Sequence, residues 1–272
     1  MGSAAKKSRR FFHVRVALLS FVLFVVVLIA ARDVRSRRAR TDWDRSLDVA
    51  IVLVEAPGAA PVSDAAVQAL RERAPALEAR LAEEMARHGR TAAPRPFRFR
   101  VFGPIAGIPA CPAPAGDGVV DLARQALAMR AWLGEVDPRA GVEPDHFDAR
   151  VYVAVRSPER ETSASVEGRS EQGGRIGFVD VELDETMADL TLFVIAHELM
   201  HTLGAEDSYD ASGRARVPAG LVEPDLQPLY PQRFAEVMAR NRPLSPTSEV
   251  PPETLDELGV GDVTARAIGW RP

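Results

Sequence analysis

Apolar and polar residues repeat with two different periods along this chain, which predicts strands and helices that follow one another in turn. Apolar or alternating runs predict strands at 47–54, 97–102, 149–155 and 175–183. Apolar residues at helical spacing predict helices at 63–88, 119–133 and 187–203. Ser63 stands where an N-cap is expected for the first of these helices.

The segments between these runs predict loops and a short closing element. Gly and Pro residues predict a loop at 103–118, and the polar stretch 158–174 predicts a loop or a hairpin. A helix or helical turns are expected over 252–268. Strands interleaved with helices predict an α/β (α+β) sandwich with a mixed sheet, formed as one domain over 45–272. The strand at 175–183 alternates enough to be an edge strand, where an extended substrate could pair by strand addition.

The N-terminus has the pattern of a targeting segment. Val16 to Ala31 is apolar apart from Ser20, and a helix of this run spans roughly 24 Å, close to a bilayer core. We therefore expect residues 1–31 to be a signal anchor or a cleaved signal peptide, followed by a basic linker at 32–44. Ser8 to Phe12 also resembles the start of a twin-arginine export signal.

Two locations follow for the body of the protein. With an anchor, the chain would be a single-pass membrane protein whose body lies outside the cytoplasm and whose N-terminal helix contacts the membrane. With a cleaved signal, the body would be secreted. The Arg residues on both sides of the apolar run leave the orientation open under the positive-inside rule.

Charge separates this leader from the rest of the chain. Residues 1–40 carry ten Lys or Arg and one acid, so this segment is +9, whereas the net charge of the whole chain is −4. The other 232 residues are therefore −13, which argues against nucleic acid as the main partner. A hydrophobic content of 46% and a charged content of 26% suit a folded body with a sizeable core.

Cys111 is the only cysteine, which excludes a disulfide within the chain and a cysteine-based zinc site. It lies in a Pro-rich stretch that reads as loop. Two interpretations are open for it: a thiolate that caps a metal to keep an enzyme latent, or an ordinary loop cysteine that is partly buried.

The candidate chemistry lies in the segment His197-Glu198-Leu199-Met200-His201, on the predicted helix 187–203. Histidines four residues apart on a helix share one face, so both imidazoles can bind one zinc ion. Glu198 can then act as general base toward a water at that ion. Gly204 can adopt a positive φ and end the helix sharply. The resulting turn would bring Asp207 back to the metal as its third ligand.

Other residues compete for roles at this site. His146, Glu223 and Glu236 are alternatives to Asp207 as the third ligand. Tyr209 or Tyr230 could donate a hydrogen bond to the oxyanion of a tetrahedral intermediate. The competing structural explanation is a polar cluster that ordinary hydrogen bonds satisfy, but burying two histidines and a glutamate in an apolar helix would be costly without a shared task.

The whole pattern, H-E-x-x-H-x-x-G-x-x-D, resembles the zinc-binding motif of the metzincin peptidases. Asp207 in the place of their usual third histidine resembles the snapalysin-like neutral proteases. The resemblance implies a metzincin-like mixed twisted sheet, an active-site helix and an irregular C-terminal subdomain. It also implies a methionine-containing turn beneath the zinc, for which Ala235 to Ala239 is the match, with Met238 below the metal. The long stretch 208–232 before Met238 departs from that pattern.

These observations predict a zinc-dependent endopeptidase that acts on protein or peptide substrates. His197, His201 and Asp207 are the expected zinc ligands, and Glu198 is the expected catalytic base. Two alternatives stay open: a zinc hydrolase acting on cell-wall peptides or small amides, and a metal-binding module without activity. A cleft along an edge strand would favour protein, and a closed pocket would favour a small amide.

Overall fold

The fold was analysed in a computed structural model, which describes residues 2–90, 95–113, 116, 118–158, 166–170 and 173–271. The chain separates into two compact units, Met1–Asp42 and Trp43–Pro272. The candidate chemistry lies entirely in the second unit, which we call the body.

The first unit is one long helix, α1 (Gly2–Thr41). Its stretch Arg15–Thr41 has the length and apolar composition of a membrane span, a test that a signal sequence near the N-terminus also passes. Apolar side chains along it, such as Leu19, Phe21 and Leu23, are exposed. The helix continues to Thr41, so most of the segment expected as a basic linker is helical.

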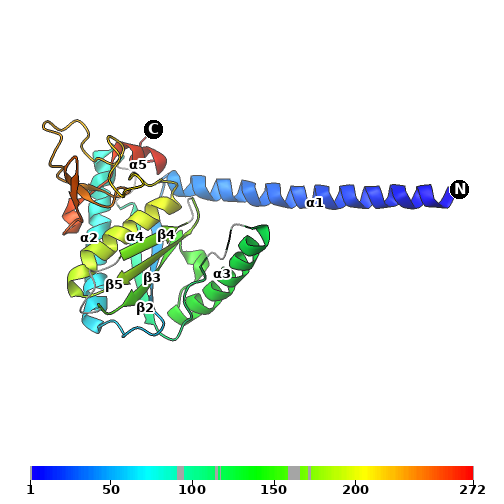
Figure 1. The fold of residues 1–272 in the computed structure, drawn as a ribbon, viewed down its shortest axis with the longest axis horizontal. Coiled ribbons are helices and arrows are strands. Elements are labelled where there is room, and N and C mark those ends of the chain that lie inside the picture. The colour runs from blue at the N-terminus through cyan, green and yellow to red at the C-terminus, as the bar shows by residue number, and fades with distance from the viewer. Residues whose placement is uncertain are drawn as a thin grey trace. The chain divides into compact units, whose positions relative to one another are not determined.

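A five-stranded mixed sheet forms the centre of the body (Figure 1). Its strand order is β2-β1-β3-β5-β4. Three of its neighbouring pairs are parallel, and β4 runs antiparallel to β5. The strands are β1 (Leu47–Glu55), β2 (Phe97–Ile105), β3 (Ala149–Arg156), β4 (Val166–Ser170) and β5 (Ile176–Glu182).

The prediction of an edge strand at 175–183 was wrong. β5 lies inside the sheet between β3 and β4, and β4 forms the edge, within the segment predicted as a loop or hairpin. The alternation along β5 arises because one face is fully covered, with Val179 and Val181 buried, whereas Asp180 on the other face is exposed. Alternation reports how well the two faces are covered, and it does not report how many neighbours a strand has.

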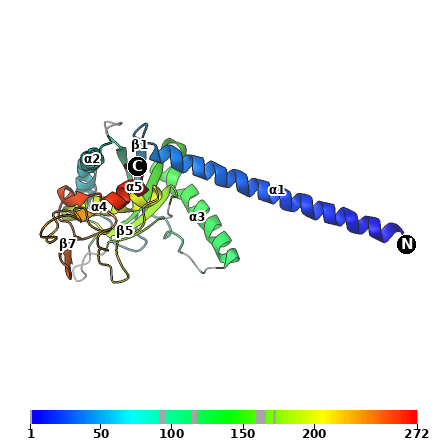
Figure 2. The ribbon, with the colours of Figure 1, turned by 90° about the horizontal axis from the view of Figure 1, so that it is seen from above.

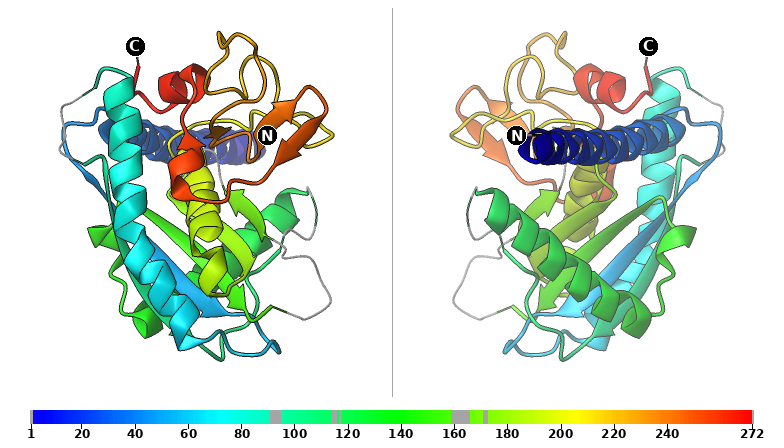
Figure 3. Two further views of the ribbon diagram at one scale, coloured as in Figure 1. Left: turned by 90° about the vertical axis from the view of Figure 1, so that its left-hand side faces the viewer. Right: turned by 90° about the vertical axis from the view of Figure 1, so that its right-hand side faces the viewer.

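Helices cover both faces of the sheet. α2 (Asp64–Arg87) and α4 (Ala188–Thr202) pack on one face, and α3 (Val119–Ala140) packs on the other, as the two opposite views in Figure 3 show. Figure 2 likewise shows α3 apart from the other two helices. Strand β1 sends alternate residues to the two faces. Val49, Ile51 and Leu53 join the core under α2 and α4, and Ala50, Val52 and Val54 join the core under α3.

Local signals in the sequence explain where the helices begin and end. The Ser63 hydroxyl accepts a hydrogen bond from the Ala66 backbone N–H at 3.1 Å, which confirms the predicted N-cap of α2. α3 continues past its predicted end to Ala140, and Gly141 closes it in the left-handed conformation. α4 matches its predicted bounds to within one residue.

The chain after α4 is mostly irregular. It contains two short pairs of strands, β6 (Ala235–Glu236) with β9 (Leu258–Gly259) and β7 (Arg242–Ser245) with β8 (Ser248–Val250). The predicted closing element is a turn, η3 (Leu255–Glu257), followed by the short helix α5 (Asp262–Ala267). Two further turns are η1 (Pro144–His146) and η2 (Glu185–Met187).

Candidate metal centre

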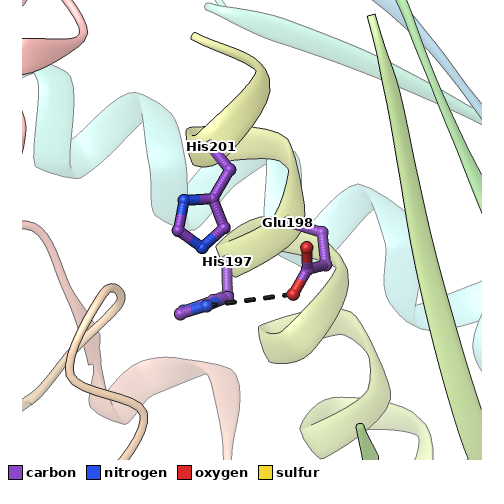
Figure 4. A group of neighbouring side chains, drawn as sticks. All are labelled: His197, Glu198 and His201. Atoms are coloured by element: carbon purple, nitrogen blue, oxygen red, sulfur yellow. Dashed lines mark ion pairs between the residues drawn. The ribbon is translucent and has the colours of Figure 1, made fainter. Parts of the chain in front are cut away.

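The α4 helix places His197 and His201 on consecutive turns of one face, next to Glu198 (Figure 4). Their ring centroids are 4.7 Å apart and the rings are perpendicular. The apolar residues of α4 bury the helix against the sheet, so that His197 and Glu198 are only 5% and 2% exposed. These three side chains form a group whose geometry could hold a metal ion.

Backbone carbonyls orient both imidazoles. His197 Nδ1 lies 2.8 Å from the Val237 carbonyl oxygen, and His201 Nδ1 lies 2.9 Å from that of Ala205. A carbonyl can only accept, so each Nδ1 must donate its proton. Both neutral imidazoles then present the lone pair of Nε2, which is the form that binds a metal.

Gly204 turns the chain so that Asp207 returns to the histidines. Its φ of +107° lies in the region that favours glycine, as the sequence predicted. Asp207 Oδ1 lies 3.3 Å from His197 Nε2 and 3.1 Å from His201 Nε2. With both imidazoles neutral, three atoms with lone pairs thus face one another, and this buried Asp207 oxygen then has no hydrogen-bond donor. Such a cluster requires a positive charge, which a proton or a metal ion can supply.

The pKa values of these groups follow from this crowding. Burial alone would lower the pKa of His197, but the neighbouring Asp207 and Glu198 carboxylates outweigh burial and raise it. Burial alone would raise the pKa of Asp207, but the two histidines lower it to about 2. The metal-free cluster therefore favours an imidazolium paired with a carboxylate. A bound cation would replace that proton, so metal affinity should rise with pH.

Glu198 lies over two glycines of the sheet, Gly168 on β4 and Gly177 on β5. A Cβ atom on Gly168 would lie 2.0 Å from Glu198 Oε1, and one on Gly177 would lie 3.1 Å from Glu198 Cβ. A side chain at Gly168 would displace this carboxylate, and one at Gly177 would press against the Glu198 Cβ atom. Glu198 Oε1 lies 3.8 Å from His197 Nε2, whereas Asp207 Oδ1 lies 3.3 Å from the same nitrogen. Burial raises the pKa of Glu198.

The turn at Val237 to Ala239 lies against the first histidine, because the Val237 carbonyl is the acceptor for His197. Met238 in this turn is fully buried in the core. Glu236, one of the rival ligands, does not serve the cluster. Its carboxylate accepts hydrogen bonds from the Met238 N–H at 2.6 Å and the Gly261 N–H at 3.0 Å, so it holds the turn in place.

Tyr209 is the predicted tyrosine that lies at the site. Its ring is nearly parallel to that of His197 with the centroids 6.5 Å apart, and burial together with a hydrogen bond to Asp207 raises the pKa of its hydroxyl. A cavity of about 350 Å³ lies over the cluster. Its lining residues are Gly168, Ser170, His197, Glu198, His201, Glu206, Asp207 and Tyr209.

The other candidates lie elsewhere. His146 is exposed beside Glu143, and Glu223 pairs with Arg233. Tyr230 does not line the cavity. The capping interpretation of Cys111 was wrong, because this residue packs against the core under α3, on the opposite face of the sheet from α4. Proline-rich loops carry no periodic signal, so the sequence could not assign Cys111 to a face.

Sequence reasoning missed Gly168 and Ser170. They lie in a short strand inside the polar segment predicted as a loop or a hairpin, a prediction that does not point to these two residues. A glycine within an alternating segment is the signal that could have pointed to a close approach.

The chain was compared with known families and with curated proteins. No family model matches it, and no curated protein matches it.

Proposed function

We propose that this chain is a zinc-dependent endopeptidase whose metal would be held by His197, His201 and Asp207. The observation that carries the proposal is the convergence of Asp207 Oδ1 on both Nε2 atoms, at 3.3 and 3.1 Å. Two imidazole nitrogens and one carboxylate oxygen are a donor set typical of a catalytic zinc site, which keeps a fourth position open. The buried Asp207 oxygen, which has no donor when both imidazoles are neutral, supports a cation at this point.

A bound zinc ion would polarise a substrate carbonyl and lower the pKa of a water molecule toward about 7. The residues of the chain do the rest. Glu198, at 3.8 Å from His197 Nε2, is placed beside the cluster as a proton acceptor and later as a donor to the leaving amine. Its raised pKa suits both roles, because a general base works best when its pKa lies near the operating pH.

Peptide rather than small amide is the substrate class that the surroundings favour. The edge strand β4 supplies Gly168 and Ser170 to the cavity over the cluster. The outer side of an edge strand has backbone groups that can pair with an extended peptide. An endopeptidase needs such an open path on both sides of the scissile bond.

Three features support the metzincin resemblance: the positive φ of Gly204, the Met238-containing turn whose Val237 carbonyl contacts the first histidine, and the mixed sheet before α4. We further propose that the body acts outside the cytoplasm, held to the membrane through α1. The apolar stretch of that helix supports this location.

Two variants of the full chain test the function. Glu198→Ala should retain zinc and lose peptide cleavage, because Glu198 is proposed as the base and not as a ligand. Asp207→Ala should lose both zinc and cleavage. Zinc content can be measured by mass spectrometry, and cleavage with casein or a quenched fluorescent peptide. Unchanged cleavage by Glu198→Ala would falsify the base assignment, and full zinc content in Asp207→Ala would remove Asp207 from the ligand set.

A further inference from the structure

Helix α3 packs on the sheet mainly through its second half, with Met129 partly buried against the same core. Within this helix the buried apolar side chains are Trp132 and Val136. The first half carries large apolar side chains that face solvent. Their exposed fractions are 84% for Val119, 61% for Val120, 53% for Leu122 and 69% for Leu127. Exposed apolar side chains grouped on one helix face mark an interaction surface, whereas single ones do not.

The outward face of this half-helix has a distinct composition. Asp121, Gln125 and Met129 are half-buried, and their spacing of four places them in one row toward the body. Besides the large apolar residues, the exposed positions hold Ala123, Ala126, Ala128, Ala131, Arg124 and Arg130. The charged residues on the exposed face are thus both basic. The single acid, Asp121, contacts Arg124 at 3.5 Å.

Within the part of the body that the structure describes, no segment covers this face, because its apolar side chains are exposed. A cover from outside the body is therefore expected for it. An apolar helix face with arginines, whose long stems can extend their charged groups to the surface, is the composition of a helix that lies in a membrane interface.

Only a short segment connects the apolar run of α1 to the body. The apolar run of α1 ends at Ala31, and ten further helical residues reach Thr41, which corresponds to roughly 15 Å. Trp43, two residues later, is already buried in the core of the body. A body tethered this tightly stays close to the lipid surface, where even weak apolar contacts are favoured by high effective concentration.

We propose that the N-terminal part of α3, residues 119–131, lies in the interface of a bilayer with anionic headgroups, as a second membrane contact besides α1. The apolar side chains would enter the boundary between headgroups and acyl chains, and Arg124 and Arg130 would meet lipid phosphates. The inference rests on the proposed membrane anchor, and it does not depend on the proposed peptidase activity. Such a contact would hold the cavity over His197 at a defined orientation to the membrane.

Tryptophan fluorescence in lipid nanodiscs tests this contact with the full chain. The native tryptophans Trp43, Trp132 and Trp270 are buried, at 1%, 7% and 1% exposure, so they give a low background of lipid quenching. Leu127→Trp reports on α3, and Val217→Trp is the matched control at another exposed apolar position, 56% exposed. Phe21→Trp reports on the anchor. Each variant is measured in discs containing phosphatidylglycerol, with and without brominated acyl chains.

We expect brominated lipid to quench most of the added emission of Leu127→Trp and Phe21→Trp and little of that of Val217→Trp. Adding Leu122→Glu to Leu127→Trp should reduce the quenching, because the charge opposes insertion. Quenching at Phe21→Trp without quenching at Leu127→Trp would overturn the α3 contact while leaving the anchor. Absence of quenching at Phe21→Trp would overturn the anchor and the inference together. Equal quenching at Leu127→Trp and Val217→Trp would overturn a specific role for α3.

Discussion

Replacing Gly168 by alanine tests whether the sheet positions the proposed base. The new Cβ would lie 2.0 Å from Glu198 Oε1, 2.6 Å from its Cδ and 3.0 Å from its Cγ. Contacts below 3.0 Å are not tolerated, so the carboxylate must move away. It is the flexible end of a side chain, and it can move without disturbing the backbone of β4.

The expected magnitude follows from this displacement. The carboxylate oxygen must retreat by about 1 Å, and a misplacement of that size in a catalytic group costs about 10²-fold in rate. This corresponds to about 2.7 kcal/mol of transition-state stabilisation. The free energy of unfolding should change by less than about 1 kcal/mol, since the strained atom can move aside. Zinc content should not change, because Glu198 is not a proposed ligand.

The assay compares kcat/KM for a fluorescent peptide, zinc content and urea denaturation in Gly168→Ala and the parent. Gly134→Ala is the matched control, because a Cβ at Gly134 meets no atom within 4 Å. It should leave kcat/KM unchanged. If Gly168→Ala cleaves as fast as the parent and binds zinc equally well, the position of Glu198 over β4 has no role in the reaction.

Three further predictions concern stability, each measured by urea denaturation. Ser63→Ala should lower the free energy of unfolding by about 1 kcal/mol, because the N-cap bond to Ala66 is lost. Glu236→Gln should cost about 2 kcal/mol, since a buried carboxylate that accepts two backbone N–H groups is replaced by an amide with only one accepting oxygen. Burial lowers the pKa of His88, so stability should fall as the pH drops below the unfolded value of about 6.5.

The sign of the His88 effect follows from proton uptake. Below about pH 6.5 the unfolded chain binds a proton at this histidine, and the folded chain does not until the pH falls further. His88→Gln should flatten the change in stability between pH 7 and pH 5, and an identical slope in this variant would contradict the prediction. Ser63→Asp, which retains an acceptor, is the control for the N-cap. For Glu236→Gln, a cost no larger than that of an exposed Glu83→Gln would mean that the carboxylate does not hold the turn.

Periodic features were the ones that the sequence could predict. Apolar residues recur several times at a regular spacing in the strands β1, β2 and β3 and in the helices α2 and α4. The spacing of four between His197 and His201 fixes their shared face as soon as the helix exists. Gly204 could be interpreted in the same way, because a positive φ has few alternatives to glycine.

Features that depend on contacts distant in sequence could not be predicted. The pattern of β5 was consistent with an edge, and only its pairing with β4 places it inside the sheet. Gly168 on β4 and Gly177 on β5 lie against Glu198 of α4. These three segments are distant in sequence, and no local pattern predicts that they meet. The same holds for Val237, whose carbonyl selects the tautomer of His197 from 40 residues away.

The sequence by itself determined the candidate site of this protein: two imidazoles on one helix face, a glutamate next to the first of them, a glycine after the second and an aspartate three residues beyond that glycine. These depend on helix geometry and backbone sterics, which act over a few residues. The tertiary structure alone decided that Asp207 reaches both Nε2 atoms, which carbonyls hold the imidazoles, and which half of α3 stays exposed. Those outcomes depend on how faces of the sheet and helices are covered, and burial is a property of the whole fold.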